Sequence, residues 1–413
     1  MKMQRALAAL SALVVGAAGL TGCSAGTSDT ASTGDVTLRW EMSADSQAEV
    51  DVWNHLADMV HQKYPNITVT FESTPYASYY NKLTSQAAAN NLACIAGLQA
   101  QRTSDVGSLF VDLKQYYSAD SAFDLGAYEP SIANGLVADG KQLAVPYDFG
   151  PFVMFYNRTA FKEAGLDEPK PGWTYEEFLA DAKKLTKGDK HGFVADGSID
   201  NWLPFVLSQG GNYMTDGKPD LANAGMVKGF TSVTDLVTKE KVAPQVPATG
   251  TSGYAADQWR SGNAAMYLDG PWQIINAKQN VKFDLGVTTF PSINGQSVTT
   301  MSGTGFGITS SCKNPADAWK AISVIVGADA QKYIAESGRG LAALKSAQPY
   351  YYQAADVPGA QEAINTALET VNIYQTPPRW SQVSTLMQQY AVEAFNGSKT
   401  PQQVLTQVQQ QAG

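Results

Sequence analysis

Residues 36–71 read VTLRWEMSADSQAEVDVWNHLADMVHQKYPNITVTF, and this stretch decides the fold class. Apolar and polar residues alternate over 36–42, the pattern of a half-buried strand. Over 47–60 the apolar residues recur at helical spacing until Tyr64-Pro65 ends the pattern, and alternation returns at 67–71. Strand, helix and strand within about 40 residues predict a βαβ unit and a sheet that contains parallel pairs.

Three further helix starts carry capping residues. Thr-Tyr-Glu-Glu at 174–177 forms a capping box, and Asn-Pro at 314–315 and Thr-Pro at 400–401 each place a cap before a proline at the first helical position. Short apolar runs at 264–268 and 283–288 lie between the helices. Because strands and helices alternate without an internal repeat, we expect an α/β fold, and 413 residues suffice for two or three domains.

Composition narrows the class of protein. Only 16% of the residues are charged, against about 25% in an average soluble chain, and 10% are aromatic. This composition excludes an intrinsically disordered chain and a coiled coil. The formal net charge is −9. Since a nucleic-acid-binding protein needs Lys and Arg to displace phosphate counterions, we expect no nucleic-acid partner.

The first residues are predicted to be an export signal rather than part of the fold. Lys2 and Arg5 form a short basic start, and an apolar stretch follows over residues 6–20. Such a stretch is shorter than the roughly 20 residues that span a bilayer, and it has the pattern of a secretory signal peptide. We see no other window that is long and apolar enough to span a membrane.

The end of this segment, Leu-Thr-Gly-Cys at residues 20–23, resembles a bacterial lipobox. It predicts a lipoprotein signal peptide at 1–22 and a lipid on the Cys23 thiol; a plain signal cleaved nearby is the alternative. Residues 23–34 are rich in Ser, Thr, Gly and Ala, which suits a flexible tether. We therefore expect an exported protein that a lipid anchors to the outer face of the cell membrane.

Two cysteines remain in the body of the chain, Cys94 and Cys312. Exported proteins meet an oxidising environment in which disulfides form and persist. A bridge between these two cysteines and a pair of buried free thiols are both open, because the local sequence does not give the distance between their Cα atoms.

Motifs for catalysis are weak. The histidines at 55, 61 and 191 do not have the spacing of a zinc-protease helix, and neither a Gly-x-Ser-x-Gly elbow nor a P-loop occurs. Residues 310–313 match Ser-x-x-Lys without a Lys-Thr-Gly partner, and the glycines of 303–307 lead into Ile-Thr rather than directly into a helix. Nothing singles out a carboxylate pair for glycoside hydrolysis. We predict no catalytic residue, no metal site and no cofactor.

Several ordered blocks carry a family resemblance. They are Val-Pro-Tyr-Asp at 145–148, Phe-Tyr-Asn-Arg at 155–158, Trp-Thr-Tyr-Glu-Glu at 173–177, Gln-Gly-Gly at 209–211, Gly-Asn-Ala-Ala-Met at 262–266, Asp-Gly-Pro-Trp at 269–272, Gly-Leu-Ala-Ala-Leu-Lys-Ser at 340–346 and Asn-Gly at 396–397. In this order they resemble family 1 extracellular solute-binding proteins, the carbohydrate-binding components of ABC importers, which include maltodextrin-binding proteins. The resemblance covers nearly all of residues 35–413. It departs at 91–95, where the family's Pro-Asp-Val is replaced, so the ligand loop from Asn91 to Arg102 is hard to align.

The resemblance implies two α/β lobes joined by a hinge, with a ligand cleft between them that closes around the ligand. One lobe would take 35–148 plus 303–352, and the other would take 149–302 plus 353–413. This division places Cys94 and Cys312 in one lobe, which favours the disulfide.

The resemblance also implies a sugar ligand. A pyranose presents apolar C–H faces and a girdle of hydroxyls, so it favours a flat aromatic ring with carboxylates, amides and Arg at the rim. Trp272 is the best stacking candidate, with Tyr76, Tyr79 and Tyr80 assigned to helix packing. The residues expected to contact the ligand, each with packing, capping or a surface position as the alternative, are Trp40, Asp45, Arg102, Asp148, Phe149, Trp202, Trp272, Gly305, Phe306, Arg339, Tyr374 and Arg379.

The expected partners are a mono- or oligosaccharide and the transmembrane subunits of an ABC permease, for a protein that is itself a monomer. A lipid-anchored extracellular glycan hydrolase is the alternative from another class. Within the binding class, glycerol-phosphate or a polyamine is the alternative ligand. A phosphate ligand would favour a cluster of Arg and Lys, and the sequence contains no such cluster.

Overall fold

The computed structural model describes residues 34–247, 253–373 and 376–412, which belong to one compact unit spanning Ala31–Gly413. The predicted βαβ unit is present. Strands β1 (Val36–Ser43) and β2 (Ile67–Thr74) are parallel neighbours, and α1 (Gln47–Lys63) joins them.

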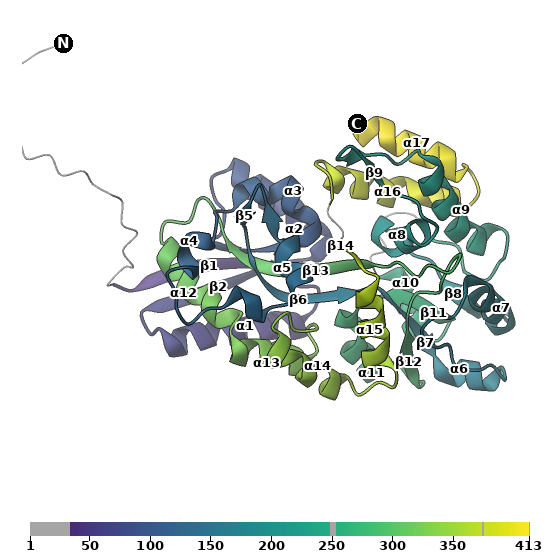
Figure 1. The fold of residues 1–413 in the computed structure, drawn as a ribbon, viewed down its shortest axis with the longest axis horizontal. Coiled ribbons are helices and arrows are strands. Elements are labelled where there is room, and N and C mark those ends of the chain that lie inside the picture. Colours follow the sequence, from purple (N-terminus) through teal and green to yellow (C-terminus); the bar gives the residue numbers. More distant parts are fainter. Residues whose placement is uncertain (1–33, 248–252, 374–375, 413) are drawn as a thin grey trace, which may run out of the picture. The chain divides into compact units, whose positions relative to one another are not determined.

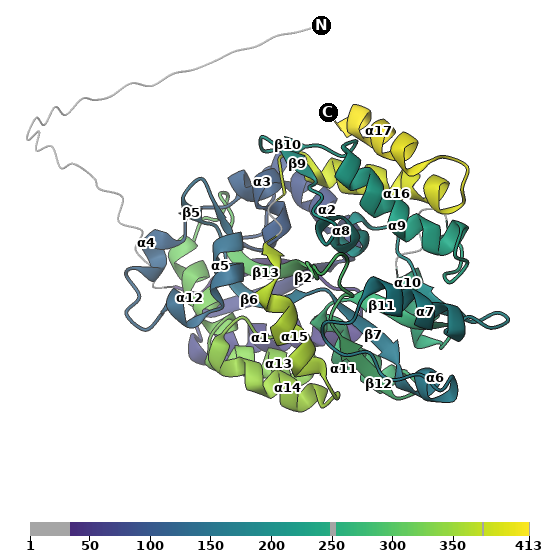
Figure 2. The same ribbon diagram turned by 45° about the vertical axis from the view of Figure 1, so that its right-hand side comes forward.

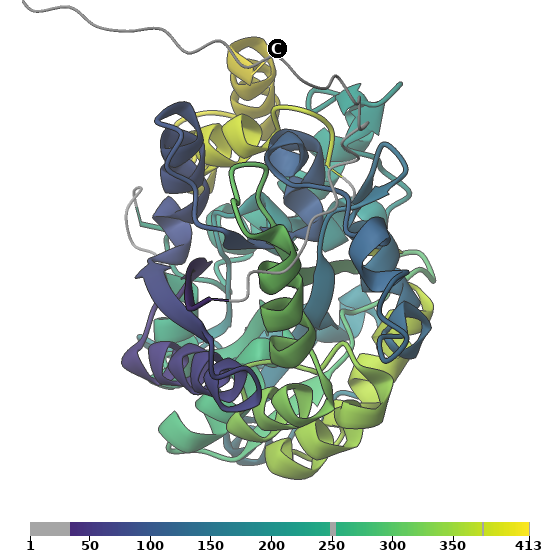
Figure 3. The ribbon, with the colours of Figure 1, turned by 90° about the vertical axis from the view of Figure 1, so that its left-hand side faces the viewer.

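Local chemistry explains where α1 begins and ends. The Ser46 side chain accepts a hydrogen bond from the backbone N of Glu49 at 3.3 Å, which caps the first turn. Pro65 disfavours the helical conformation for the residue before it, so the helix stops at Lys63. The stripe that includes Trp53 is fully buried against the sheet. Figure 3 shows α1 beside α12 (Pro315–Ile325), and α13 (Ala328–Ser337) also packs on it.

A six-stranded sheet forms the first half of the fold (Figure 1). Its order is β14 (Asn372–Ile373), β13 (Thr300–Ile308), β3 (Ile95–Gln99), β1 and β2, and β6 (Val145–Pro151) also pairs with β13. Strands β1, β2 and β3 are parallel, whereas β13 is antiparallel to β3 and β6. We call this sheet and its helices lobe 1. Besides α1, α12 and α13, these helices are α2 (Tyr76–Ala88), η1 (Ala100–Arg102), α3 (Thr103–Val106), η2 (Gly107–Leu109), α4 (Lys114–Tyr117), η3 (Leu125–Ala127), α5 (Pro130–Gly135) and η5 (Lys345–Ala347), with the hairpin β4 (Val137–Ala138) and β5 (Lys141–Gln142).

A four-stranded sheet forms the second half, which we call lobe 2. Its order is β12 (Leu285–Thr288), β7 (Val153–Asn157), β11 (Ala264–Asp269) and β8 (His191–Val194), and β11 is parallel to β8. Its other elements are α6 (Arg158–Glu163), α7 (Tyr175–Leu185), α8 (Ile199–Leu207), α9 (Ala224–Thr238), α10 (Tyr254–Arg260), η4 (Pro271–Gln273), α11 (Ile274–Asn280), α16 (Trp380–Phe395) and α17 (Pro401–Ala412), with the hairpin β9 (Met214–Thr215) and β10 (Lys218–Pro219).

All three predicted helix starts are confirmed, but the Asn314 side chain makes no capping hydrogen bond. Helix α7 begins after a complete capping box, in which Thr174 and Glu177 each bond the other's backbone N–H. Helices α12 and α17 begin at Pro315 and Pro401. The missing proline N–H costs nothing at these positions, because the first helical N–H groups have no partner within the helix.

The chain passes between the two sheets three times. Figure 2 labels the strands at the first two passages, β6, β7, β12 and β13. The chain leaves lobe 1 between β6 and β7, returns between β12 and β13, and leaves again between β14 and α16. Helix α14 (Gln348–Ala355) packs on α13 and α11, and α15 (Ala360–Glu369) packs on β6, β7 and β12. These two helices therefore contact elements of both lobes.

A disulfide joins Cys94, just before β3, to Cys312, just before α12. Both segments belong to lobe 1, and this is the pairing that the resemblance implied. The predicted signal peptide, Cys23 and Tyr374 lie outside the described residues. Within the described ranges, no helix combines the length and hydrophobicity needed to cross a membrane.

Candidate functional site

The candidate site is built at the carboxyl ends of the parallel strands. In open α/β sheets, ligands bind in the crevice beyond these ends. In lobe 1 the strands β1, β2 and β3 end at Ser43, Thr74 and Gln99. In lobe 2 the parallel strands β8 and β11 end at Val194 and Asp269. The loops and helix starts that follow these five positions supply most of the side chains of the candidate site.

Tyr76, the first residue of α2, presents an aromatic ring at this end of lobe 1. It is 39% exposed, and its hydroxyl donates to Gln99 Oε1 at 3.1 Å. Burial of the hydroxyl raises the pKa of Tyr76; the Arg102 charge acts to lower it, and the charge of Asp200, in lobe 2, acts to raise it. The side chain therefore lies within electrostatic range of both lobes.

The assignment of the three tyrosines to helix packing is wrong for Tyr76 alone. Tyr79 is 1% exposed, and its hydroxyl donates to the carbonyl oxygens of Glu41 and Gly97. The Tyr80 hydroxyl accepts from the backbone N of Gln99 at 2.9 Å. Tyr76 directly follows Pro75, the N-cap residue of α2, and remains exposed there.

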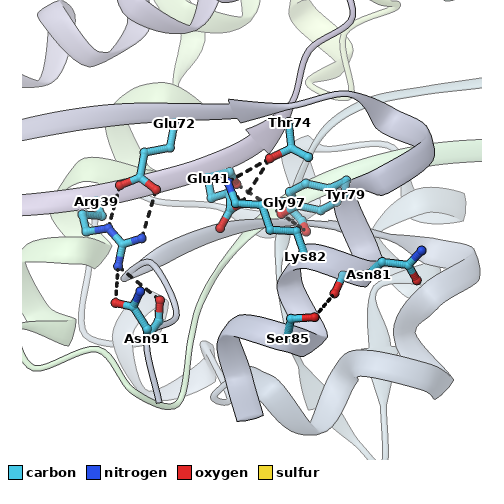
Figure 4. Close-up of polar contacts among 10 residues, drawn as sticks. All are labelled: Arg39, Glu41, Glu72, Thr74, Tyr79, Asn81, Lys82, Ser85, Asn91 and Gly97. Carbon is cyan, nitrogen blue, oxygen red and sulfur yellow. Dashed lines mark hydrogen bonds and ion pairs between the residues drawn. The ribbon is translucent and has the colours of Figure 1, made fainter. Parts of the chain in front are cut away.

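Helix α2 is held to the sheet by a buried ion pair, shown in Figure 4. Glu41 of β1 has no exposed surface, and its Oε1 lies 2.7 Å from Lys82 Nζ of α2. The same Nζ donates to Thr74 Oγ1 at 2.9 Å. Beside this pair, Arg39 donates to both carboxylate oxygens of Glu72, at 2.6 and 2.9 Å. These bonds fix the position from which Tyr76 projects.

Two predicted arginines lie near the junction with α16. Arg102 Nη1 donates to Ser381 Oγ at 2.7 Å, and its guanidinium lies 5.4 Å from the centre of the Tyr80 ring. Arg379 precedes α16, and its Nη2 donates to Gln382 Oε1 at 3.0 Å. Arg102 is thus shared between Tyr76 on one side and the start of α16 on the other.

Trp272 of lobe 2 lies on the backbone of Gly270. A Cβ added to Gly270 would come within 2.1 Å of the Trp272 ring, so only glycine allows this approach. The ring is half-buried and meets Phe152 edge-on, with centroids 5.5 Å apart. Phe152 is the residue between β6 and β7, so Trp272 lies where the chain passes between the lobes.

Carboxylates surround this end of lobe 2. Asp269 is 7% exposed and accepts from the Tyr267 hydroxyl and from the backbone N of Gly270 at 2.7 Å. Burial raises the pKa of Asp269 to about 6, and the nearby charge of Asp196 adds to that shift. Burial also raises the pKa of Asp196, which accepts from the backbone N of Ser198 at 2.8 Å.

Three of the predicted residues meet at a second polar group, at Arg339. Its Nη2 donates to the Tyr147 hydroxyl at 3.1 Å, its Nη1 lies 3.9 Å from Asp148 Oδ2, and its Nε lies 3.8 Å from Glu49 Oε1. The charge of Asp45 also acts on Arg339. Asp148 is buried, which raises its pKa to about 6 although Arg339 opposes the shift. The Arg339 charge is therefore largely balanced by its own surroundings.

The structure places four of the predicted aromatic contacts in the core instead, which corrects the prediction. Trp40 is fully buried, with its ring against Trp53, Phe71 and Phe306. Phe306 is fully buried as well and stacks on Tyr147. These side chains leave no surface that a ligand could touch. The other two are Phe149 and Trp202, each 1% exposed, and Trp202 packs on Phe230.

Gly305 is also a packing residue. A Cβ there would come within 2.5 Å of the carbonyl oxygen of Val145 on β6, next to the bulge in the β6–β13 pairing. The close approach of the two strands therefore explains the glycine. Asp45 is exposed, and its Oδ1 accepts from the backbone N of Tyr76 at 3.0 Å. It thus lies beside the exposed ring.

The sequence interpretation missed Asp196, Asp200 and Asp269. Asp269 stands inside the quoted Asp-Gly-Pro-Trp block, and Asp196 follows a strand end, so both had a usable signal. Asp200 lies in the first turn of α8, where a carboxylate is favourable for any helix, and no local pattern marks it as part of a site. Among the described residues, no group of His, Cys, Asp and Glu could hold a metal ion.

The chain belongs to the family of bacterial extracellular solute-binding proteins, whose profile matches residues 48–332. Family members are binding proteins of transporters, not enzymes. A binding protein of Brucella abortus is 23% identical over 364 residues, covering 83% of this chain and 84% of the relative. The sn-glycerol-3-phosphate-binding periplasmic protein of Salmonella typhimurium is 28% identical over 183 residues, 41% of this chain and 40% of the relative.

Solved structures show the same fold. The ABC substrate-binding protein Lmo0181 of Listeria monocytogenes, in complex with cycloalternan, has a TM-score of 0.83 at 21% identity and covers 92% of this chain and 98% of that one. Maltose-bound MalE3 of T. maritima has a TM-score of 0.74 at 20% identity, with 91% and 98% covered. The two-lobed periplasmic-binding-protein-like α/β fold predicted from the sequence is thereby confirmed.

Proposed function

We propose that this protein is the solute-binding component of an ABC importer and that it captures a neutral sugar, an oligosaccharide, between its two lobes. The family supplies the role in transport. The ligands bound to the two structural neighbours are cycloalternan and maltose, so sugars are the first class of ligand to test. We propose that lobe 1 and lobe 2 are the two bodies that close on the ligand. The resemblance gives their ranges as 35–148 plus 303–352 and 149–302 plus 353–413, and we assign β14 (Asn372–Ile373) to lobe 1 because it pairs with β13.

One observation carries the sugar proposal. Two partly exposed aromatic rings lie just beyond strand ends: Tyr76 of lobe 1 follows β2, and Trp272 of lobe 2 follows β11. Aromatic faces suit the apolar C–H faces of a pyranose, and carboxylate oxygens accept hydrogen bonds from its hydroxyls. Asp45 and Asp269 supply such oxygens beside Tyr76 and Trp272 respectively.

The charges of the site favour a neutral ligand over a phosphate. The balanced position of Arg339 between Glu49 and Asp148 leaves it little net charge to offer an anion. On the lobe 2 side a phosphate would meet Asp196, Asp200 and Asp269, at a cost in like-charge repulsion. We therefore use the similarity to the glycerol-phosphate-binding protein as support for the family, and we do not infer a phosphate ligand from it.

The decisive experiment is a calorimetric scan of the purified protein against a library of neutral oligosaccharides, with sn-glycerol-3-phosphate and spermidine as comparison ligands. We expect one neutral sugar to bind with 1:1 stoichiometry and to be recovered chemically unchanged after long incubation. Binding of glycerol-phosphate or spermidine alone would contradict the ligand class. Release of glycan fragments would contradict the binding role itself.

Export and anchoring are further parts of the proposal. We propose cleavage after residue 22, a lipid on Cys23, and a monomer that docks on the permease from the outer face of the membrane. In the producing cell, we expect wild-type protein in the membrane fraction and Cys23→Ala protein outside it. Equal partition of the two into the soluble fraction would contradict the anchor and leave the sugar proposal intact.

A further inference from the structure

Helix α16 takes its N-terminal cap from the other lobe. The residue before it, Arg379, has a left-handed backbone (φ +70°) and makes no side-chain capping bond of its own. Asp105 of α3 occupies the capping position instead. Its Oδ1 accepts from the backbone N of Arg379 at 2.6 Å, and its Oδ2 accepts from the backbone N and the Oγ of Ser381, at 2.7 and 2.5 Å. A carboxylate is the group that a helix N-terminus favours most.

The two partners are held by different lobes. Helix α3 belongs to lobe 1, where it packs on η1, η2 and β4 and where Val106 is buried. Helix α16 packs on α8, α9 and α17 of lobe 2, and the buried Trp380 lies 5.3 Å from the Tyr213 ring. A movement that carries α16 away from α3 would therefore break all three hydrogen bonds of the Asp105 carboxylate.

The same contact positions a predicted ligand residue. Ser381 Oγ donates to Asp105 and accepts from Arg102 Nη1, so one hydroxyl joins the carboxylate to the guanidinium. Arg102 in turn acts on Tyr76. A chain of contacts thus runs from the cap of α16 to the exposed ring.

We propose that Asp105 and Ser381 are positioning residues that latch the lobes in the ligand-bound arrangement and hold Arg102 in place. The inference rests on the proposed binding function. With the lobes together, the carboxylate accepts three hydrogen bonds, two of them from backbone N–H groups at the positive end of a 16-residue helix. With the lobes apart, both the carboxylate and the helix start return to water. The latch raises the fraction of closed protein and, through it, the apparent affinity.

The test compares Asp105→Ala, Asp105→Asn and Ser381→Ala with a matched control. Asp124→Ala is the control, because Asp124 also caps a backbone N–H, that of Gly126 at 2.8 Å, but within lobe 1. Lobe opening is followed without ligand by small-angle scattering and by a donor–acceptor dye pair placed on the two lobes. Affinity and dissociation rate are measured with the sugar that binds the wild-type protein in the library scan.

We expect Asp105→Ala to shift the ligand-free protein towards the open arrangement and to weaken binding about 10-fold, equal to about 1.4 kcal/mol, mainly through faster dissociation. Asp105→Asn and Ser381→Ala should show smaller changes in the same direction, and Asp124→Ala should show none. A wild-type-like lobe distance and dissociation rate, with only a lower unfolding midpoint, would overturn the latch, because a merely structural contact lowers stability alone. If no sugar binds the wild-type protein, the proposed function fails, and the lobe distance without ligand still decides the latch.

Discussion

Trp272 is the residue on which the sugar proposal depends most, because its ring is fixed on Gly270 and against Phe152 while part of it stays exposed. A preorganised ring loses little freedom when a ligand binds. We expect Trp272→Ala to weaken sugar binding by about 1–3 kcal/mol, the scale of one aromatic contact with its buried area. Calorimetry with the sugar identified for the wild-type protein measures this loss. An unchanged affinity would remove Trp272 from the site.

Tyr76 allows a controlled version of the same test. It is 39% exposed and Tyr350 of α14 is 36% exposed, so the two tyrosines differ in location rather than in accessibility. We expect Tyr76→Ala to weaken binding about 5- to 50-fold, since an aromatic face and a bond to Gln99 are both lost. Tyr350→Ala should bind as the wild-type protein does. Equal effects of the two substitutions would mean that Tyr76 does not touch the ligand.

Asp269 makes a pH prediction whose sign follows from burial. Its pKa is about 6 in the folded protein, against about 3.9 in an unfolded chain. Between pH 4 and pH 6 the folded state keeps a proton on Asp269 that the unfolded state has lost, so the unfolding free energy falls as the pH rises. The stability that comes from protonated Asp269 is therefore fully present below about pH 4 and is lost by about pH 6. It amounts to about 2–3 kcal/mol. The groups that face Asp269 are Tyr267, Asp196, Trp272 and the Gly270 N–H.

Urea unfolding between pH 4 and pH 7 measures the contribution of Asp269. Asp269→Asn keeps one acceptor oxygen, which serves either Tyr267 or Gly270, and it cannot titrate. Its unfolding free energy should therefore fall less over this pH range than that of the wild-type protein. Asp124→Asn, which changes an exposed capping carboxylate, is the control. Parallel pH profiles for Asp269→Asn and wild type would show that Asp269 titrates normally in the folded state.

At the scale of elements, the ion pair between Glu41 and Lys82 decides where α2 lies. Glu41 is fully buried, whereas the Lys82 side chain is 37% exposed. Lys82→Met would leave a buried carboxylate without its counter-charge, and we expect a loss of about 2–4 kcal/mol in unfolding free energy. The double variant with Glu41→Gln should recover part of that loss, because it removes the stranded charge. A Lys82→Met protein as stable as wild type would mean that the ion pair between Glu41 and Lys82 does not stabilise the fold.

Elements marked by local chemistry were predictable from the sequence, and contacts between distant elements were not. Alternation, helical spacing and capping residues located β1, α1, α7, α12 and α17, because these signals act within a few residues. The alternation of apolar and polar residues in β1 correctly predicted that Trp40 lies on the buried face of the strand. It carries no information on the depth of that side chain relative to the ligand site, so Trp40 was predicted at the rim and lies in the core.

The contacts of the candidate site could not be predicted from the sequence. The bond between Asp105 and Ser381 joins residues 276 positions apart, and neither residue belongs to a local motif. Tyr76 was assigned to helix packing together with Tyr79 and Tyr80, and its exposure at the first residue of α2 separates it from them. Asp45, Asp148 and Arg339 were each expected to contact the ligand, and these three residues do lie close together. Asp148 stands in a family block and Arg339 stands beside one.

For the whole molecule, ligand binding and lobe closure are linked to stability. A ligand that binds only the folded protein raises the unfolding free energy by RT ln(1 + [L]/Kd), about 2.7 kcal/mol at 100 times Kd. We expect this increase for the wild-type protein in urea titrations with and without the sugar. At the same sugar concentration the increase for Asp105→Ala should be smaller by about 1.4 kcal/mol, because its affinity is expected to be 10-fold lower.

This difference separates closure from simple destabilisation. If Asp105 only stabilised the fold, the variant would start from a lower unfolding free energy and gain as much from the sugar as the wild-type protein gains. If Asp105 latches the lobes, the variant gains less from the sugar whatever its starting value, because part of the binding energy must first close an open protein. Asp124→Ala is the control, because Asp124 caps a backbone N–H outside the contact between the lobes. We expect the sugar to raise its unfolding free energy by as much as it raises that of the wild-type protein. A full gain in Asp105→Ala as well would leave α16 capped by a neighbour that takes no part in closing the lobes.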